Sequence, residues 1–281
     1  MTCSVRTTAP RRKRRLPCSL SVIALFDSGL GGLSLLRELR RQLPGHDLSY
    51  VADSAHCPYG PKHGEFVRDR SLAIGRSLER AQADALVVAC NSAVAAGALE
   101  ALRAELAIPV IGIEPGVKPA VAMTQTGVVG VLATAISVAS DRLASLVERF
   151  ADGVEVVTQP CPGLVERVEA GLVDGGETRA LVERYVAPLL ARDVDVLVLG
   201  CTHYPFLRRL IAEVAPGVAI VDPGPAVARQ GARVVAEHSI AEGTGSVVYA
   251  TTGDPALVEP VLRRLTGDPR AVVEHSAASG A

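Results

Sequence analysis

Short apolar runs alternate with longer amphipathic stretches along almost the whole chain. Runs rich in valine, isoleucine and leucine are typical of buried strands, and apolar residues at three- and four-residue spacing are typical of helices. We expect strands at 21–26, 48–52, 85–89, 110–113, 128–133, 154–158, 195–199, 218–221 and 247–251, with a weaker candidate at 271–274. We expect helices between them, for example at 33–43, 65–83, 92–106 and 178–192. This alternation predicts βαβ units and therefore an α/β fold with parallel sheets.

Three segments from the first half of this pattern recur in the second half. The stretch ALVVACNSA around Cys90 matches VLVLGCTHY around Cys201, and each is a strand followed by a cysteine and polar residues. IPVIGIEPG likewise matches GVAIVDPGP, and ALFDSGLGG matches VGVLATAIS more loosely, at nearly the same spacing. The repeats predict two pseudo-symmetric parallel-sheet domains of the Rossmann or flavodoxin type. Ligands bind outside the carboxyl ends of such strands, so two facing domains would bring both thiols to one cleft between them.

The composition excludes several classes of function. The 281 residues are 48% hydrophobic and 21% charged with a net charge of −1, which disfavours a protein that coats nucleic acid. Tryptophan is absent and aromatic residues make up 3%, so a base-stacking surface is not expected either. Lysine occurs only as Lys13, Lys62 and Lys118, whereas a pyridoxal phosphate enzyme needs a lysine for its Schiff base. The six cysteines form no CxxC pair and lack zinc-ligand spacing, so we expect free thiols.

The N-terminus allows two interpretations. Residues 11–26, RRKRRLPCSLSVIALF, have the charged block and the apolar run of a signal peptide. No small-x-small cleavage site follows, however, and the run leads directly into DSGLGG, which is typical of a functional loop. We therefore favour a disordered basic tail at 1–20 on a cytoplasmic protein. No other apolar segment is long enough for a transmembrane helix, so no membrane partner is expected.

Cys90 and Cys201 are the strongest candidates for chemistry. Either cysteine alone would most often be a small buried hydrophobic residue. Their matched positions at strand ends favour instead a catalytic pair, in which the start of a following helix stabilises the thiolate. Two thiols on either side of a small substrate suggest a two-base reaction. One thiolate would remove a proton from a carbon and the other thiol would deliver one to the opposite face, which inverts the configuration.

Polar residues near these cysteines are candidate helpers. Asp27 and Ser28 precede three glycines whose N–H groups suit an anion such as an amino-acid carboxylate, since the nucleotide-loop patterns are absent. Asp27 would position Cys90 or a substrate ammonium group, and a helix N-cap role fits the pattern equally well. His203 follows the Cys201 thiol at a strand end, so we expect it to assist proton transfer. A metal site formed by Cys201 and His203 would lack further ligands nearby in the sequence. The loop ADSAHCPYGPK at 52–62 would supply specificity contacts.

In these residues the chain resembles the glutamate racemases, which are cofactor-independent enzymes of the aspartate/glutamate racemase superfamily. The matching stretches, in the order of the family, are FDSGLGGLSLL, VADSAHCPYGPK, ALVVACNSA, IPVIGIEPG, CPGLVERVEAG and VLVLGCTHYPFL. The combination of CNSA with GCTHYP is highly specific. The resemblance implies racemisation of L-glutamate to D-glutamate for bacterial peptidoglycan synthesis. It also implies a homodimer that uses no cofactor and no metal.

The resemblance further implies roles for individual residues. Cys90 would deprotonate D-glutamate and Cys201 would deprotonate L-glutamate, while Asp53 would lie behind the site. The assisting catalytic groups would be Asp27, Glu169 and His203. Substrate contacts are expected from Asp27, Ser28, Pro58, Tyr59, Gly60, Asn91, Ser92, Thr134, Ser137, Thr202 and His203. The two domains would be discontinuous, with the first formed by 21–114 and 224–281 and the second by 115–223.

A few positions depart from the family pattern. Ser92 and Ser137 stand where threonine is common, and both preserve the hydroxyl group. His56 and Cys57 are unusual before the proline that follows them, and would alter the rim of the cleft. With the nearby Tyr59, they are equally compatible with a solvent-exposed turn.

Two other functions stay open on the sequence alone. A racemase for another amino acid, such as aspartate, would share the superfamily motifs, although the CTHY and CNSA stretches favour glutamate. A non-catalytic protein that closes two α/β lobes around an anionic metabolite would bind glutamate but leave its α-proton in place.

Overall fold

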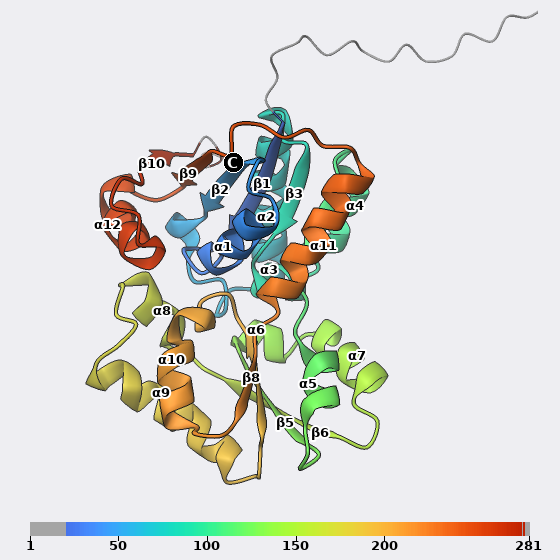
Figure 1. Ribbon diagram of the computed structural model, residues 1–281, viewed down its shortest axis with the longest axis vertical. Helices are drawn as coiled ribbons and strands as arrows, with labels where there is room; N and C mark the ends of the chain where they lie inside the picture. Colours follow the sequence, from blue (N-terminus) through green and yellow to red (C-terminus); the bar gives the residue numbers. More distant parts are fainter. Residues whose placement is uncertain (1–20, 277, 279–281) are drawn as a thin grey trace, which may run out of the picture.

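The computed structural model describes residues 21–276 and 278, which form two α/β halves, each built on its own sheet (Figure 1). The strand order is β10-β9-β2-β1-β3-β4 in the first sheet and β6-β5-β7-β8 in the second. All neighbouring strands run parallel. The predicted fold class is thereby confirmed. The proposed tail at 1–20 lies outside the described residues.

The strands lie close to their predicted positions. The first sheet contains β1 (Val22–Asp27), β2 (Asp47–Ala52), β3 (Ala85–Val88), β4 (Val110–Gly112), β9 (Val247–Thr251) and β10 (Val273–His275). The second contains β5 (Val128–Ala133), β6 (Glu155–Pro160), β7 (Val196–Gly200) and β8 (Ala219–Val221). Strands β3 and β7 are buried along their whole length, which explains why both are continuous apolar runs without alternation.

Helices cover both sheets (Figure 1). Those of the first half are α1 (Leu33–Gln42), α2 (Gly64–Arg80), α3 (Asn91–Ala95), α4 (Ala98–Glu105), α11 (Gly224–Glu237) and α12 (Pro255–Thr266), with a short 3-10 helix η1 (Ser54–His56). Those of the second half are α5 (Val117–Met123), α6 (Ala135–Val138), α7 (Asp141–Phe150), α8 (Leu164–Glu169), α9 (Gly176–Leu190) and α10 (Arg208–Val214), with η2 (Tyr204–Leu207). Within the described part of the chain, no helix has both the length and the hydropathy needed to cross a membrane.

The prediction of one continuous helix at 92–106 is wrong. The chain forms α3 and α4 instead, separated at Gly97, whose φ is 78°. A positive φ interrupts a right-handed helix, and glycine adopts it without the steric penalty of a Cβ atom. The break makes α3 a short helix that begins directly after Cys90.

The two halves share one topology, as the sequence repeats predict. The order β2-β1-β3-β4 within the first sheet corresponds to β6-β5-β7-β8 in the second. In such sheets a crevice forms where the strand order reverses, which is between β1 and β3 in one half and between β5 and β7 in the other. Cys90 follows β3 and Cys201 follows β7, so both cysteines lie beside these crevices.

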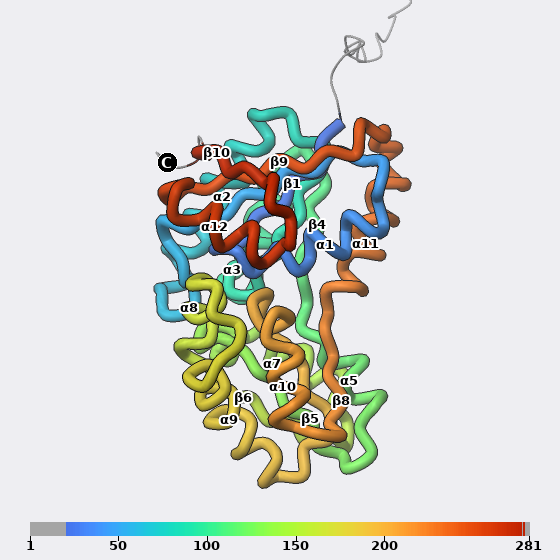
Figure 2. Tube along the Cα trace, turned by 60° about the vertical axis from the view of Figure 1, so that its left-hand side comes forward, coloured from blue at the N-terminus to red at the C-terminus, as the bar shows by residue number. Residues whose placement is uncertain are grey.

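The chain passes between the halves twice, from β4 to α5 and from β8 to α11, and the two connections run close together (Figures 1 and 2). After the second passage, β9 pairs with β2 and β10 pairs with β9, so the C-terminal segment completes the first sheet. This arrangement agrees with a discontinuous first domain. The exact boundaries at 114/115 and 223/224 stay a prediction.

Asp47, at the start of β2, fastens the segment that leads into β9. Its Oδ1 accepts hydrogen bonds from the backbone N–H groups and the hydroxyl groups of Thr244 and Ser246, at 2.8–3.1 Å. These hydrogen bonds lower the pKa of Asp47 to about 2, and the bond from the Ser246 N–H contributes most. The carboxylate thus helps to attach the returning C-terminal segment to the first sheet.

We predict that Asp47→Asn destabilises the fold in a pH-dependent manner. Because the pKa of Asp47 is lower in the folded than in the unfolded state, its stabilising effect is complete above about pH 4 and is lost as the pH falls toward about 2. Thermal unfolding should therefore show a Tm difference from wild type at pH 6 that shrinks below pH 4. Asp69→Asn, at an exposed position of α2, is the control. A Tm difference that does not change with pH would contradict the assignment.

Candidate active site

Both predicted thiols line one small cavity between the carboxyl ends of the two sheets. Cys90 contributes from the first half and Cys201 from the second. The rest of the wall is formed by Ser28, Pro58, Tyr59, Gly60, Asn91, Ser92, Thr134, Val165, Thr202 and His203. All of these except Val165 are among the predicted site residues. Val165 is an aliphatic residue of α8 and carries no chemical signal in the sequence.

The cavity is too small for an amino acid. Its volume is about 10 Å³, which is enough for roughly one water molecule. Because its wall is divided between the two halves, a larger ligand enters only when the halves move apart. The structure therefore represents a closed form of the site.

Cys90 lies in an apolar and negatively charged environment. It is the residue before α3 and is 3% exposed. Burial raises the pKa of Cys90, and the nearby Asp27 carboxylate raises it further, while N–H groups of Ala93 and Ser28 offset only part of the effect. The N–H groups at the helix start therefore act on Cys90 in the predicted direction, but burial and Asp27 outweigh them and the pKa of Cys90 is raised.

Asp27 joins the two halves beneath the cavity. Its Oδ2 accepts hydrogen bonds from the Gly32 N–H at 2.8 Å and from the Thr202 hydroxyl at 3.2 Å. Burial raises the pKa of Asp27, against the opposing influence of His203 and of the Gly32 hydrogen bond. Asp27 does not line the cavity itself but contacts Cys90, so it can exchange a proton with that thiol.

His203 links Cys201 to a carboxylate. Its Nδ1 lies 3.6 Å from the Cys201 Sγ, and its Nε2 lies 2.5 Å from Oε1 of Glu169. Burial lowers the pKa of His203, but hydrogen bonds to Cys201, Cys57 and Glu169 outweigh this effect and hold the pKa well above its usual value. The imidazole is therefore placed to exchange a proton with the Cys201 sulfur.

The N–H groups of the glycine loop after β1, which we predict to form an anion nest, are partly occupied by the chain itself. Two of its N–H groups already bind carboxylates of the chain itself, Asp27 and Glu169. The glycines provide space instead: a Cβ atom at Gly29 would collide with Glu169, and one at Gly31 would collide with His203. The loop therefore holds the acid and base groups in place.

Polar groups on the cavity wall are arranged to receive a polar ligand. The hydroxyl of Ser92 lies 2.9 Å from that of Thr134, which in turn lies 2.9 Å from the hydroxyl of Ser137 behind it. The buried side-chain amide of Asn91 has no hydrogen-bond partner among the described residues. A buried unpaired polar group costs about 1–3 kcal/mol, so this amide suits a ligand that supplies the missing partners.

The loop after β2 reaches the cavity through Tyr59. This residue is 1% exposed, so the alternative of a solvent-exposed turn is wrong for Tyr59. Its hydroxyl donates a hydrogen bond of 2.6 Å to Asp53, which also forms an ion pair with Arg70 at 2.8 Å. Burial raises the pKa of Asp53, but hydrogen bonds from Arg70 and Tyr59 outweigh it and lower the pKa. The Asp53 carboxylate therefore fixes Tyr59 from behind, in the position behind the site that the family resemblance implies.

The site contains a further cluster of ionisable groups that the sequence does not reveal. Ligand atoms of Cys57, Glu169 and His203 all lie within 4.8 Å of one another. The sequence shows no further ligands close to His203 along the chain, but the fold brings Cys57 and Glu169 to it from distant segments. The two described lysines lie elsewhere: Lys62 stacks over Phe66, and Lys118 is exposed on α5.

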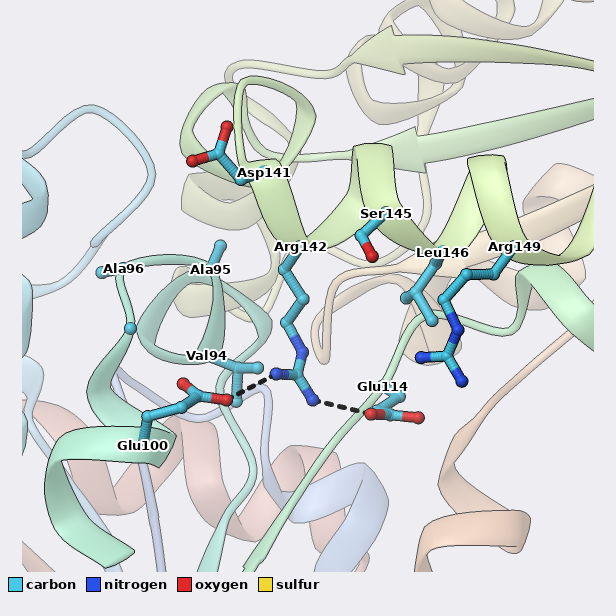
Figure 3. Close-up of a pocket in the computed structure, with 11 residues that line it drawn as sticks. Val94, Ala95, Ala96, Glu100, Glu114, Asp141, Arg142, Ser145, Leu146 and Arg149 are labelled. Carbon is cyan, nitrogen blue, oxygen red and sulfur yellow. Dashed lines mark hydrogen bonds and ion pairs between the residues drawn. The ribbon is translucent and has the colours of Figure 1, made fainter. Parts of the chain in front are cut away.

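A larger hollow opens between α4 and α7 on the surface (Figure 3). Its volume is about 560 Å³, and Arg142 crosses it with ion pairs to Glu100 at 2.7 Å and Glu114 at 2.6 Å. Arg142 belongs to the second half, whereas Glu100 belongs to the first and Glu114 to one of the connections. A narrow hollow lined by Arg142 and Asn91 lies between this surface pocket and the thiol cavity. The ion pairs therefore fasten the two halves in the closed form.

Comparison with known proteins identifies relatives over almost the whole chain. The Asp/Glu/Hydantoin racemase family model matches residues 31–231. A glutamate racemase from Pseudomonas aeruginosa is 49% identical over 255 residues, covering 90% of this chain and 96% of that protein.

Solved structures agree with this result. A glutamate racemase isoform from Bacillus anthracis superposes with a TM-score of 0.83 at 33% identity, covering 92% of this chain and 98% of that one. The Escherichia coli glutamate racemase gives a TM-score of 0.82 at 31% identity, covering 92% and 99%. The chain therefore belongs to the Asp/Glu/hydantoin racemase family and, within it, to the glutamate racemases.

Proposed function

We propose that the protein interconverts L- and D-glutamate by proton transfer through Cys90 and Cys201, and so supplies D-glutamate for peptidoglycan. The observation that carries the proposal is that thiols from two opposed sheets line one cavity. The crystal structure of the similar Escherichia coli enzyme contains L-glutamate, which supports glutamate as the substrate. The unpaired amide of Asn91 and the hydroxyl of Ser92 are suited to the α-carboxylate.

In the direction from L-glutamate, the Cys201 thiolate removes the α-proton. His203, as an imidazolium, stabilises this thiolate. The Cys90 thiol then donates its proton to the opposite face of the carbon. The raised pKa of Cys90 supports its role as the proton donor in this direction. In the reverse direction, Asp27 accepts the Cys90 proton before Cys90 acts as the base. Hydrogen bonds to the α-carboxylate stabilise the carbanion-like transition state in a cavity that excludes water.

Opening and closing of the two halves is part of the proposed cycle. The cavity of about 10 Å³ has no room for glutamate, so the halves separate to admit the substrate and then close around it, which brings the two thiols to its opposite faces. Homodimer formation, which rests on the family resemblance, and a cytoplasmic location both stay predictions.

The direct test is incubation of the purified protein with L-glutamate in D₂O. We expect D-glutamate with deuterium at Cα, and we expect Cys90→Ala and Cys201→Ala each to lower the rate by at least about 10²-fold, because each removes one proton carrier. Cys161→Ser, which removes a buried thiol outside the cavity, is the control and should stay active. Binding of glutamate without exchange at Cα would instead indicate a binding protein.

The two acid–base pairs should be separable by isotope effects. The rate constant kcat/KM falls equally for both enantiomers in any variant, because the equilibrium constant of racemisation is one. His203→Asn should nevertheless raise the primary isotope effect for L-[2-²H]glutamate above that for the D-enantiomer, since it slows the step at Cys201. Asp27→Asn should do the reverse, and both variants should lose about 10²–10⁴-fold in kcat/KM. The same isotope pattern in both variants would refute the assignment of one helper to each thiol.

Arg142→Met should weaken closure of the two halves. An ion pair of this exposure contributes up to about 1 kcal/mol, and the form that it fastens has no room for glutamate, so we expect KM for glutamate to fall by up to about fivefold. The effect should shrink at high salt, which screens the pair in the wild-type protein. Arg149→Met removes an arginine from the same pocket without breaking an ion pair to the first half, and is the control. Equal changes in KM in the two variants would rule out the fastening role of Arg142.

A further inference from the structure

Cys57, Glu169 and His203 lie together beside the thiol cavity, and the proposed reaction gives no role to Cys57. Cys57 lies in the loop after β2, Glu169 ends α8, and His203 follows β7, so three separate segments supply one donor each. Their donor atoms lie within 4.8 Å of one another. Cys57 is not needed for proton transfer by either catalytic thiol, and it does not line the thiol cavity.

The three donors are a sulfur, a nitrogen and an oxygen, the set that zinc prefers. In a tetrahedral zinc site the metal lies about 2.3 Å from sulfur and about 2.0–2.1 Å from nitrogen or oxygen. The corresponding separations between donor atoms are about 3.3–3.6 Å. The distance between His203 Nε2 and Glu169 Oε1 is 2.5 Å, and no two donor atoms of the cluster are more than 4.8 Å apart. The separations that zinc requires lie between these two values. Side-chain adjustments of about 1 Å are therefore sufficient.

Surrounding contacts already hold two of the donors in position. The Leu30 N–H donates a hydrogen bond of 2.6 Å to Oε1 of Glu169. The side chain of His203 is buried, and its Nδ1 is directed to Cys201, which leaves Nε2 on the side of Glu169. Metal-binding histidines are oriented in the same way, with the second ring nitrogen engaged by another group.

We propose that Cys57, Glu169 and His203 form an inhibitory binding site for a thiophilic divalent cation such as Zn²⁺. The cation takes the position of the proton between His203 Nε2 and Glu169 Oε1 and bonds to the Cys57 sulfur as a thiolate. The displaced protons pass to solvent, and a water molecule completes the tetrahedral set. Neither oxidation nor reduction is involved.

Such a cation would connect the two halves of the protein. Cys57 belongs to the first half, whereas Glu169 and His203 belong to the second. Bound metal would therefore hold the site in the closed form, whose cavity of about 10 Å³ does not admit glutamate. It would also occupy the imidazole that assists Cys201. The cation site goes beyond the proposed function, whereas its inhibitory effect rests on that function.

The binding test uses Co²⁺ as a spectroscopic substitute for zinc. The parent protein carries Cys3→Ser and Cys18→Ser, because these thiols lie outside the described residues. We expect Co²⁺ to produce a thiolate-to-cobalt charge-transfer band in the parent and in Cys161→Ser, but not in Cys57→Ser. This readout does not depend on racemisation. Absence of the band in the parent, or its persistence in Cys57→Ser, would overturn the site.

The functional test compares inhibition by Zn²⁺ in the same proteins, each measured against its own metal-free rate. Cys57→Ser should raise the half-inhibitory concentration of Zn²⁺ by at least about tenfold. Loss of a residue that merely supports a metal ligand already weakens metal binding by about 10–100-fold. Cys161→Ser should match the parent, and added glutamate should protect the parent. Equal sensitivity of Cys57→Ser and Cys161→Ser would contradict inhibition through this cluster. A parent that binds Co²⁺ but does not racemise glutamate would refute the proposed function and leave the cation site standing.

Discussion

Two sulfur atoms must reach one small space from opposite sides, and most of the structure serves this constraint. Neither half provides the space alone, because each parallel sheet presents a single crevice at the point where its strand order reverses. Placing the two crevices face to face brings Cys90 and Cys201 to one cavity. The glycine loop, the hydroxyl groups and the carboxylates around the cavity then determine how closely the halves approach.

The two thiols are both buried, but their neighbours differ. Burial raises the pKa of Cys90, and the carboxylate of Asp27 beside it raises the pKa further. Cys201 has His203, whose own pKa is raised by its hydrogen-bond partners despite burial. The pseudo-symmetric fold therefore holds an asymmetric pair of acid–base groups. We infer that this asymmetry lets one thiol accept a proton while the other donates one.

Much of the arrangement can be predicted from the sequence, for identifiable physical reasons. Buried parallel strands are continuous apolar runs, so their positions and the internal repeat can be recognised in the sequence. The cysteines at the ends of two of these strands indicate where the cavity lies. The break in the helix at Gly97 is harder to predict from the sequence, because a single glycine is tolerated in many helices. The use of the glycine loop by Asp27 and Glu169 could not be predicted, since it depends on contacts between residues far apart in the sequence. The same holds for the cluster around Cys57, whose members come from three segments.

A crystal structure of the protein with glutamate tests the positions of the two sulfur atoms most directly. We predict that the Sγ atoms of Cys90 and Cys201 lie on opposite faces of the substrate, each about 3–3.5 Å from its Cα atom. A complex in which glutamate contacts only one of these sulfur atoms, or in which both lie on the same face, would contradict the account.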